Sequence, residues 1–174
     1  HRAWGLWFLP VTLVLAVTGV TLAWPDDSRE AVALVSPITG RLHESMADVP
    51  EIPPAIDVDI AIGRVVGKSG EPVHGVRLFP DHGVYAVRTF DARDRDDQGR
   101  LWTYVAMDDG RIVGTRHDNG VTAGDQFFAW QYPLHSGKAF GLAGRLLILA
   151  GGVVTLWLCL SGLKLWWRRQ RQLL

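Results

Sequence analysis

Cysteine is almost absent from this sequence, which contains Cys159 and no other. A single cysteine excludes an intrachain disulfide, so cysteine usage indicates no redox compartment. The sequence also lacks a His-x-x-x-His or Cys-x-x-Cys pair, a glycine-rich phosphate loop and a nucleotide-binding fingerprint. These absences leave a soluble zinc enzyme or a nucleotide-dependent enzyme without support, and nothing in the sequence indicates nucleic-acid binding.

Acidic residues are missing from both ends of the chain. All 18 Asp and Glu residues lie between Asp26 and Asp125, so the two flanks carry only basic charge. The overall composition, with 48% hydrophobic residues and a net charge of zero, hides this division. Apolar, basic ends around a polar, acidic middle are typical of a membrane protein that carries a water-exposed domain.

The first apolar run extends from Ala3 to Trp24 without a charge. At about 1.5 Å per residue, its 22 residues form a helix of roughly 33 Å, which crosses the hydrocarbon core. Trp4 and Trp7 mark one interface and Trp24 marks the other. A cleaved signal peptide is the alternative, but its apolar core is usually shorter and no small-residue cleavage site precedes Pro25. We therefore predict a retained span within residues 1–25.

The second apolar run covers residues 140–167, with an uncharged centre from Leu146 to Leu163. The positive-inside rule places its basic end, residues 168–174, in the cytoplasm, and Arg2 places the start of the chain there too. The sequence therefore predicts a bacterial inner-membrane protein with cytoplasmic termini and a periplasmic middle. Gly19, Gly151 and Gly152 would let the spans pack on each other or on a partner. The residues that end this run form a stop-transfer signal: Trp166, Trp167, Arg168, Arg169 and Arg171.

Residues 26–55 are predicted to form a connector, in which Ser28 caps a short helix. Residues 56–131 are predicted to form a folded domain. Its first segment, Ile56 to Val66, fits both a strand and one helical face, and a cap at Asp57 with an end at Gly67 favours a helix. The charged segment from Asp91 to Arg100 is expected to be an exposed loop.

Four strands are predicted after this helix, and the turn at residues 108–110 joins the last two as a hairpin. A helix on a small antiparallel sheet is an α+β domain. The strands are expected at Val76–Phe79, Gly83–Phe90, Leu101–Met107 and Arg111–Arg116. The expected core residues are Tyr85, Val87, Leu101, Trp102, Val105, Ile112 and Val113.

Two C-terminal runs are more specific than these patterns. Residues 132–145 contain a Leu-His-x-Gly stretch and a Gly-x-x-Gly-Arg helix start, and residues 161–169 run from Ser-Gly to Trp-Trp-Arg-Arg. Together with the start at residues 1–7 and the Thr-Gly-Val at residues 18–20, they resemble the PepSY-associated transmembrane family. The helix and the hairpin at residues 109–113 are similar to a PepSY domain. Residues 132–139 are expected to be a loop that carries the Leu-His-Ser-Gly motif.

The resemblance implies candidate ligands for haem b at His1 and His135. Imidazole is the usual axial ligand of such haems. The two histidines are expected on opposite sides of a bilayer roughly 30 Å thick, so they cannot share one iron. A homodimer or another subunit would have to supply the second histidine at each level. Otherwise His135 forms a hydrogen bond in its loop and His1 is an interface residue. His43, His74, His82 and His117 are expected to be surface or turn residues.

The resemblance supports two functions. Longer members of the family look like inner-membrane haem reductases that release iron from siderophores, but they have about four spans. This chain has two spans and no visible catalytic set, which favours an accessory subunit. Such a subunit would dock on a larger haem or iron redox complex and cover or regulate its periplasmic face. The alternative is a dimeric b-type haem protein that transfers electrons to ferric siderophores. Regulation of a peptidase by the PepSY domain rests on analogy alone.

Overall fold

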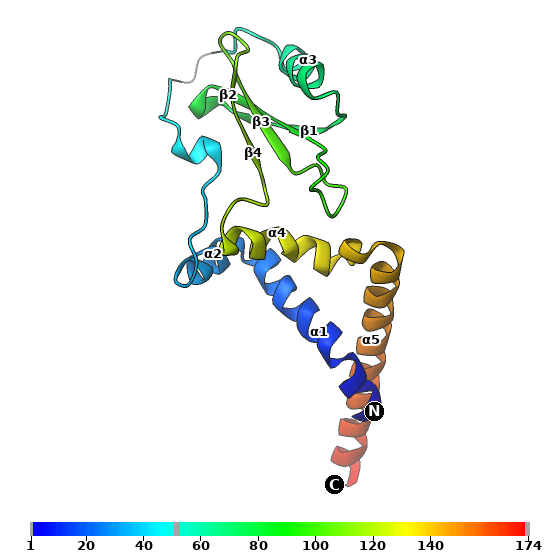
Figure 1. The fold of residues 1–174 in the computed structure, drawn as a ribbon. Coiled ribbons are helices and arrows are strands. Elements are labelled where there is room, and N and C mark those ends of the chain that lie inside the picture. Colours follow the sequence, from blue (N-terminus) through cyan, green and yellow to red (C-terminus); the bar gives the residue numbers. More distant parts are fainter. Residues whose placement is uncertain (1, 51–52, 173–174) are drawn as a thin grey trace. The chain divides into compact units, whose positions relative to one another are not determined.

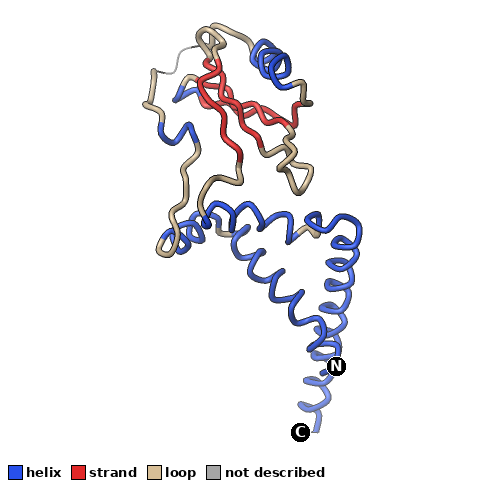
Figure 2. Tube along the Cα trace, viewed as in Figure 1, coloured by secondary structure: helices blue, strands red, loops and turns tan. Residues whose placement is uncertain are grey.

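The computed structural model describes residues 2–50 and 53–172 (Figures 1 and 2). The chain divides into two compact units. The membrane unit comprises His1–Ser28 and Trp130–Leu174, and the central domain comprises Arg29–Ala129. Two helical segments are long and apolar enough to span a bilayer, Gly5–Ala23 and Lys138–Arg171. The fold is therefore that of a membrane protein with two transmembrane helices and an α+β domain, as predicted.

The two long helices of the membrane unit, α1 (Arg2–Ala23) and α5 (Gly141–Gln172), pack on each other. A Cβ atom at Gly151 would lie 3.0 Å from Val11, and one at Gly5 would lie 4.0 Å from Leu158. Because the contacts ascend along α1 as they descend along α5, the two helices are antiparallel. Of the two roles predicted for Gly151, packing within the chain is the one that the structure shows.

Two shorter helices, α2 (Pro25–Ala33) and α4 (Ala123–His135), run across the boundary between the units. The prediction that Ser28 caps α2 is wrong, because the helix begins at Pro25 and the Ser28 N–H donates to the carbonyl of Trp24 at 3.1 Å. Proline has a fixed φ and lacks an N–H, so it is favoured at the first helical position. The predicted loop at residues 132–139 is also partly wrong, because residues 132–135 form the last turn of α4. A short 3₁₀ helix, η3 (Lys138–Phe140), then leads into α5.

The central domain contains the helix α3 (Val58–Ser69). Asp57 caps it as predicted, since its side chain accepts a hydrogen bond from the Val58 N–H at 2.7 Å. The predicted end at Gly67 is wrong. The helix ends at Gly70, which has φ +71° and donates its N–H to the carbonyl of Val66 at 2.8 Å. A left-handed residue closes a helix in this way, and glycine adopts that conformation without a steric cost.

Four antiparallel strands form one sheet in the order β1-β2-β3-β4 (Figure 1). All four predicted strands are present, although the first begins earlier than the sequence suggested. Short 3₁₀ helices precede β1 in the chain (η1, Leu42–Ser45) and follow it (η2, Pro80–His82). The strands are β1 (Val73–Phe79), β2 (Val84–Thr89), β3 (Leu101–Ala106) and β4 (Ile112–His117).

Both faces of the sheet carry buried side chains. One face packs on Ala61 and Val65 of α3, and the predicted core residues Tyr85, Val87 and Val105 lie there. Ile112 packs against this cluster, but its neighbour Val113 is 39% exposed, so its prediction was wrong. Successive residues of a strand point to opposite faces of the sheet. Ile112 lies on the face of β4 that α3 covers, and Val113 therefore lies on the other face. Leu101 is half-buried. The other face contains Val84, Ala86 and Tyr104, with Leu42, Met46, Phe79 and Trp102 around them.

Candidate functional site

The membrane unit holds one of the two predicted ligand histidines against α1. His135 is the last residue of α4, and its Nδ1 lies 2.8 Å from the Thr18 hydroxyl. Thr18 is buried, with 3% of its surface exposed, while His135 is half-buried. The ring also lies beside Gly19, where a Cβ atom would stand 3.5 Å from its Cε1. The Thr-Gly pair of α1 and the Leu-His motif of α4 therefore meet in space.

The hydrogen bonds of Thr18 bear on which nitrogen of His135 carries the proton. The hydroxyl has one hydrogen, and its oxygen lies 2.7 Å from the carbonyl oxygen of Val14, which can only accept. Both contacts are formed at once when the hydroxyl donates to Val14 and accepts from the Nδ1–H of His135. A neutral imidazole that is protonated at Nδ1 has its lone pair on Nε2, which is the form that binds a metal.

A second polar pair holds the same two helices together. The Thr21 hydroxyl lies 2.8 Å from the side-chain oxygen of Gln131, and both residues are buried. Thr18 and Thr21 are three residues apart on α1, and Gln131 and His135 are four apart on α4, so each pair shares one helical face. Thr21 and Gln131 were not among the predicted site residues. Their signal was the Thr-x-x-Thr spacing within an apolar run, a place where unpaired hydroxyls are costly.

Glycines fix the turn that carries His135 from α4 to α5. Gly137 has φ +72°, and a Cβ atom there would lie 2.6 Å from the backbone of Gly144. A Cβ atom at Gly144 would in turn collide with the carbonyl oxygen of Gly137. Only two residues without side chains can cross this closely. The Leu-His-x-Gly and Gly-x-x-Gly-Arg motifs thus form one contact, and that contact sets the position of His135.

The structure shows less about the remaining predicted site residues. His1 lies outside the described residues, as does the side chain of Trp4. The other predicted anchors are exposed: Trp7 lies on α1, Trp24 directly follows it, and the rest lie on α5. Arg171 lies over the Trp167 ring with 5.6 Å between the guanidinium carbon and the ring centroid. Their role at the membrane interface stays a prediction. These anchors are Trp7, Trp24, Trp166, Trp167, Arg168, Arg169 and Arg171.

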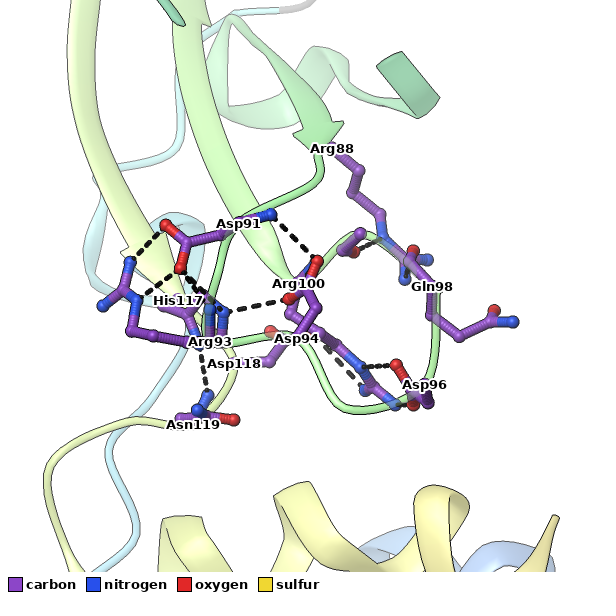
Figure 3. Close-up of polar contacts among 11 residues, drawn as sticks. Arg88, Asp91, Arg93, Asp94, Asp96, Gln98, Arg100, His117, Asp118 and Asn119 are labelled. Carbon is purple, nitrogen blue, oxygen red and sulfur yellow. Dashed lines mark hydrogen bonds and ion pairs between the residues drawn. The ribbon is translucent and has the colours of Figure 1, made fainter. Parts of the chain in front are cut away.

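A second polar cluster lies in the central domain, where the sequence predicted an exposed loop (Figure 3). The segment is a loop, as predicted, but the prediction of exposure is wrong for much of it, because the buried Asp96 forms an ion pair with Arg100. The Arg100 guanidinium also lies 3.8 Å from Asp118. Asp94 accepts from the backbone N–H of Arg100 at 3.1 Å. Alternating carboxylates and guanidiniums thus tie the loop to the end of β4.

His117 is part of this cluster and is not the surface residue that the sequence suggested, since only 7% of it is exposed. Its Nδ1 accepts from the Asn119 N–H at 3.1 Å, so Nε2 carries the proton and donates to Asp94 at 3.1 Å. Both nitrogens of His117 are therefore used in holding the loop (Figure 3). This histidine stabilises the fold and has no lone pair to offer a metal.

Several pKa values reflect this cluster. The hydrogen bonds from Arg93 to Asp91 hold the pKa of that carboxyl well below its usual range, against the opposing effect of burial. Burial would lower the pKa of Arg100, but the hydrogen bond to Asp96 together with the negative charges of Asp96, Asp118 and Asp94 outweighs burial, and the pKa is raised.

The other histidines of the central domain make local contacts. His43 stacks on Phe79 with 3.8 Å between the ring centroids, and burial lowers its pKa. His82 lies 3.4 Å from Asp48, and His74 lies beside Phe90. Across residues 2–50 and 53–172, no three His, Cys, Asp or Glu side chains come together as a metal site.

The helix pair, the histidine at the end of α4 and the α+β domain define a class of membrane protein, and comparison with known families agrees. The family model of the PepSY-associated TM region matches residues 1–169. The chain belongs to this family. No curated protein matches the sequence.

Proposed function

We propose that this chain is a membrane component of a haem-containing redox complex, in which His135 supplies one axial ligand to a b-type haem. The hydrogen bond between Thr18 and His135 carries the proposal, because it leaves the lone pair of the ring on Nε2. Haem-ligating histidines characteristically have their other ring nitrogen held by a second residue of this kind. His117, whose two nitrogens both have partners, lacks this property.

The residues around His135 fit such a group. The ring stands beside Gly19 at the end of two apolar helices, where a large flat apolar cofactor finds hydrocarbon surroundings. Thr18 and the contact between Gly137 and Gly144 hold the imidazole in place before binding. Bound haem would supply one-electron transfer. The protein would fix the ligand, exclude water through its apolar helices and hold the Nδ1 proton on the Thr18 side.

The number of histidines in the chain leads us to propose that a second protein chain takes part in haem binding. His135 is the only histidine in the described part of the membrane unit, residues 2–28 and 130–172. A six-coordinate iron at this level would need its second histidine from a homodimer partner or from another subunit. His1 is proposed to play the same part at the other membrane surface. By the positive-inside rule, the basic tail supports a cytoplasmic location for that surface and a periplasmic one, at the inner membrane, for His135.

The visible spectrum of the protein purified in mild detergent tests the proposal. The wild-type protein, produced with an ample haem supply, should show the absorbance of a b-type haem. The His135→Ala substitution should remove the haem that this residue binds. His74→Ala removes an exposed histidine of β1 and should leave the spectrum unchanged. A wild-type protein without haem absorbance, or an unaltered His135→Ala spectrum, would contradict the proposal.

A second candidate is an accessory subunit that binds no haem itself and covers or regulates the periplasmic face of a larger redox complex. The single histidine of the described membrane unit favours it, since one imidazole gives an incomplete ligand set. In this case the purified protein should be colourless and His135→Ala should leave its partners unchanged. A larger complex should be recovered with the chain in mild detergent.

A further inference from the structure

A cationic cavity in the central domain is a separate feature from the histidine site. It has a volume of about 710 Å³ and lies between η1 with its preceding turn and the end of β4. We call it the arginine cavity. The charged residues in its lining are Arg41, Arg93, Arg116 and Glu44. Hydroxyl and imidazole groups also line it, from Thr39, Ser45, Thr115 and His117.

The charge of this cavity is opposite to that of the domain around it. The sequence between Asp26 and Asp125 contains every acidic residue of the chain, yet three arginines face one carboxylate here. Arg93 is neutralised by Asp91, with 2.6 Å between Nε and Oδ1. Within the described residues, no carboxylate lies in ion-pair distance of Arg41 or Arg116. In the cavity lining, Glu44 is the one carboxylate beside these two guanidiniums.

The Arg116 side chain is held at the cavity by the fold. Arg116 is half-buried on β4, and its Nη2 donates to the carbonyl of Thr39 at 2.7 Å. Thr39 is itself fixed, because its N–H donates to Asp125 at 2.9 Å. Glu44 is turned to the backbone, where it accepts from the Arg41 N–H at 2.7 Å. A guanidinium has five N–H donors, so Arg116 has others to offer a ligand.

The electrostatics of a buried neighbour show that both guanidiniums act on the same region. Burial raises the pKa of Tyr104, and the positive charges of Arg116 and Arg41 oppose that rise. Tyr104 lies on β3, beside the strand that carries Arg116. Arg41 immediately precedes η1 and Arg116 lies on β4, so positive charges from two elements act at one phenol, where the carboxylates of Asp118 and Glu44 act in the opposite sense.

We propose that the arginine cavity binds a small oxyanion, a phosphate or a carboxylate, through Arg41 and Arg116. Guanidiniums recognise these groups by paired N–H donors. Arg116 is half-buried, and Arg41 is exposed at the rim of the cavity. The hydroxyls of Thr115 and Ser45 are available as further donors at the wall of the cavity. This site is independent of haem binding and would give the central domain a ligand of its own.

Calorimetric titration of the full chain tests the proposal, with inorganic phosphate and citrate as probes. Both Arg41→Gln and Arg116→Gln should weaken binding at least about tenfold, since a hydrogen bond to a charged group contributes about 1.5–3 kcal/mol. Arg77→Gln is the matched control, because it removes an exposed arginine of β1 outside the cavity. Circular dichroism of each variant shows whether the fold is retained.

The same titration in lipid nanodiscs separates a soluble anion from a lipid headgroup. If phosphatidylglycerol occupies the cavity, its nanodiscs should weaken phosphate binding in the wild type relative to phosphatidylcholine nanodiscs, and the Arg41→Gln chain should lose that difference. Equal phosphate binding in both lipids assigns the site to a soluble anion. The proposal is overturned if neither probe binds, or if Arg77→Gln weakens binding as much as the two cavity variants do.

Discussion

Two histidines of this chain show how a neighbouring group decides what an imidazole can do. In His117 the Asn119 N–H and Asp94 use both ring nitrogens. In His135 the Thr18 hydroxyl uses Nδ1, and Nε2 retains its lone pair. The residue type is the same, but only the second has a metal-binding atom to offer. Thr18 is therefore as informative about the site as the histidine itself.

Replacing Thr18 should weaken haem binding without removing the ligand. Thr18→Val keeps the shape of the side chain but leaves Nδ1 of His135 without its acceptor, so the ring loses its fixed orientation. Loss of such a supporting residue typically lowers affinity about 10–100-fold. Thr18→Ser keeps the hydroxyl and should bind nearly as the wild type does. Haem titration of the apoprotein measures the difference, and equal affinities for the valine variant and the wild type would refute the role of Thr18.

Asp125 should make the stability of the chain depend on pH. It accepts hydrogen bonds from the N–H groups of Thr39, Val121 and Thr122 at 2.9, 3.0 and 3.1 Å. Burial would raise its pKa, but these bonds and the one from the Thr39 hydroxyl outweigh burial and lower the pKa to about 2. A depressed carboxyl pKa stabilises the fold above the unfolded pKa of about 3.9, and the effect disappears as the pH falls toward 2.

The test compares Asp125→Asn with the wild type by thermal unfolding in detergent. At neutral pH the variant should be less stable by roughly 2–3 kcal/mol, and the two melting temperatures should converge between about pH 4 and pH 2. Asp81→Asn changes an exposed carboxylate of η2 and serves as the control. A constant gap between Asp125→Asn and the wild type over this range would contradict the assignment.

At the scale of elements, the short crossing between Gly137 and Gly144 joins α4 to α5. Gly144→Ala places a methyl group against the carbonyl of Gly137, and neither backbone can yield without moving a helix. Overpacking of this kind costs about 1–3 kcal/mol, so the melting temperature should fall by several degrees. Gly152→Ala is the matched control on the same helix, because nothing lies within 4 Å of its Cβ position. Similar melting temperatures for the two variants would argue against the crossing.

The regular elements of this chain could be predicted from its sequence, because their signals are local. The cap at Asp57 and the alternating pattern of β2 need no information from distant residues. The loop at residues 91–100 could not be predicted in the same way. Its partner His117 comes from the end of β4 and reaches the loop only through the strand register that pairs Leu101 with His117. A charged segment with such partners is indistinguishable in sequence from an exposed one.

The candidate site could be predicted only in part, because one of its residues belongs to a local motif and the other comes from a distant part of the chain. His135 was identified through the family motif, but its partner Thr18 lies 117 residues earlier in the chain. Only the packing of α4 on α1 reveals that these two side chains meet. The motif also hid a helix, since Pro133 reads as a break although α4 continues to His135. Tertiary contacts outweighed local preference at both positions.

At the scale of the whole molecule, the two membrane helices are antiparallel, so the start of α1 and the end of α5 lie on the same side. The charge pattern then predicts that this side is the cytoplasm, because Arg168, Arg169 and Arg171 follow the second span. A reporter that is active only in the cytoplasm should work after Leu174 and fail near Gly99. A reporter that is active only in the periplasm should show the opposite pattern. Cytoplasmic activity at Gly99 would reverse the orientation and the proposed place of His135.

The most direct test of the proposed function is to identify the nitrogen that meets the iron. Hyperfine spectroscopy on haem-loaded protein with ¹⁵N-labelled histidine resolves coordinated imidazole nitrogens, and the His135→Ala variant provides the blank. The proposal predicts a coupled nitrogen that is assigned to Nε2 of His135, a signal that the blank lacks. A haem-loaded protein whose nitrogen couplings are the same in the wild type and in His135→Ala would show that His135 is not the ligand.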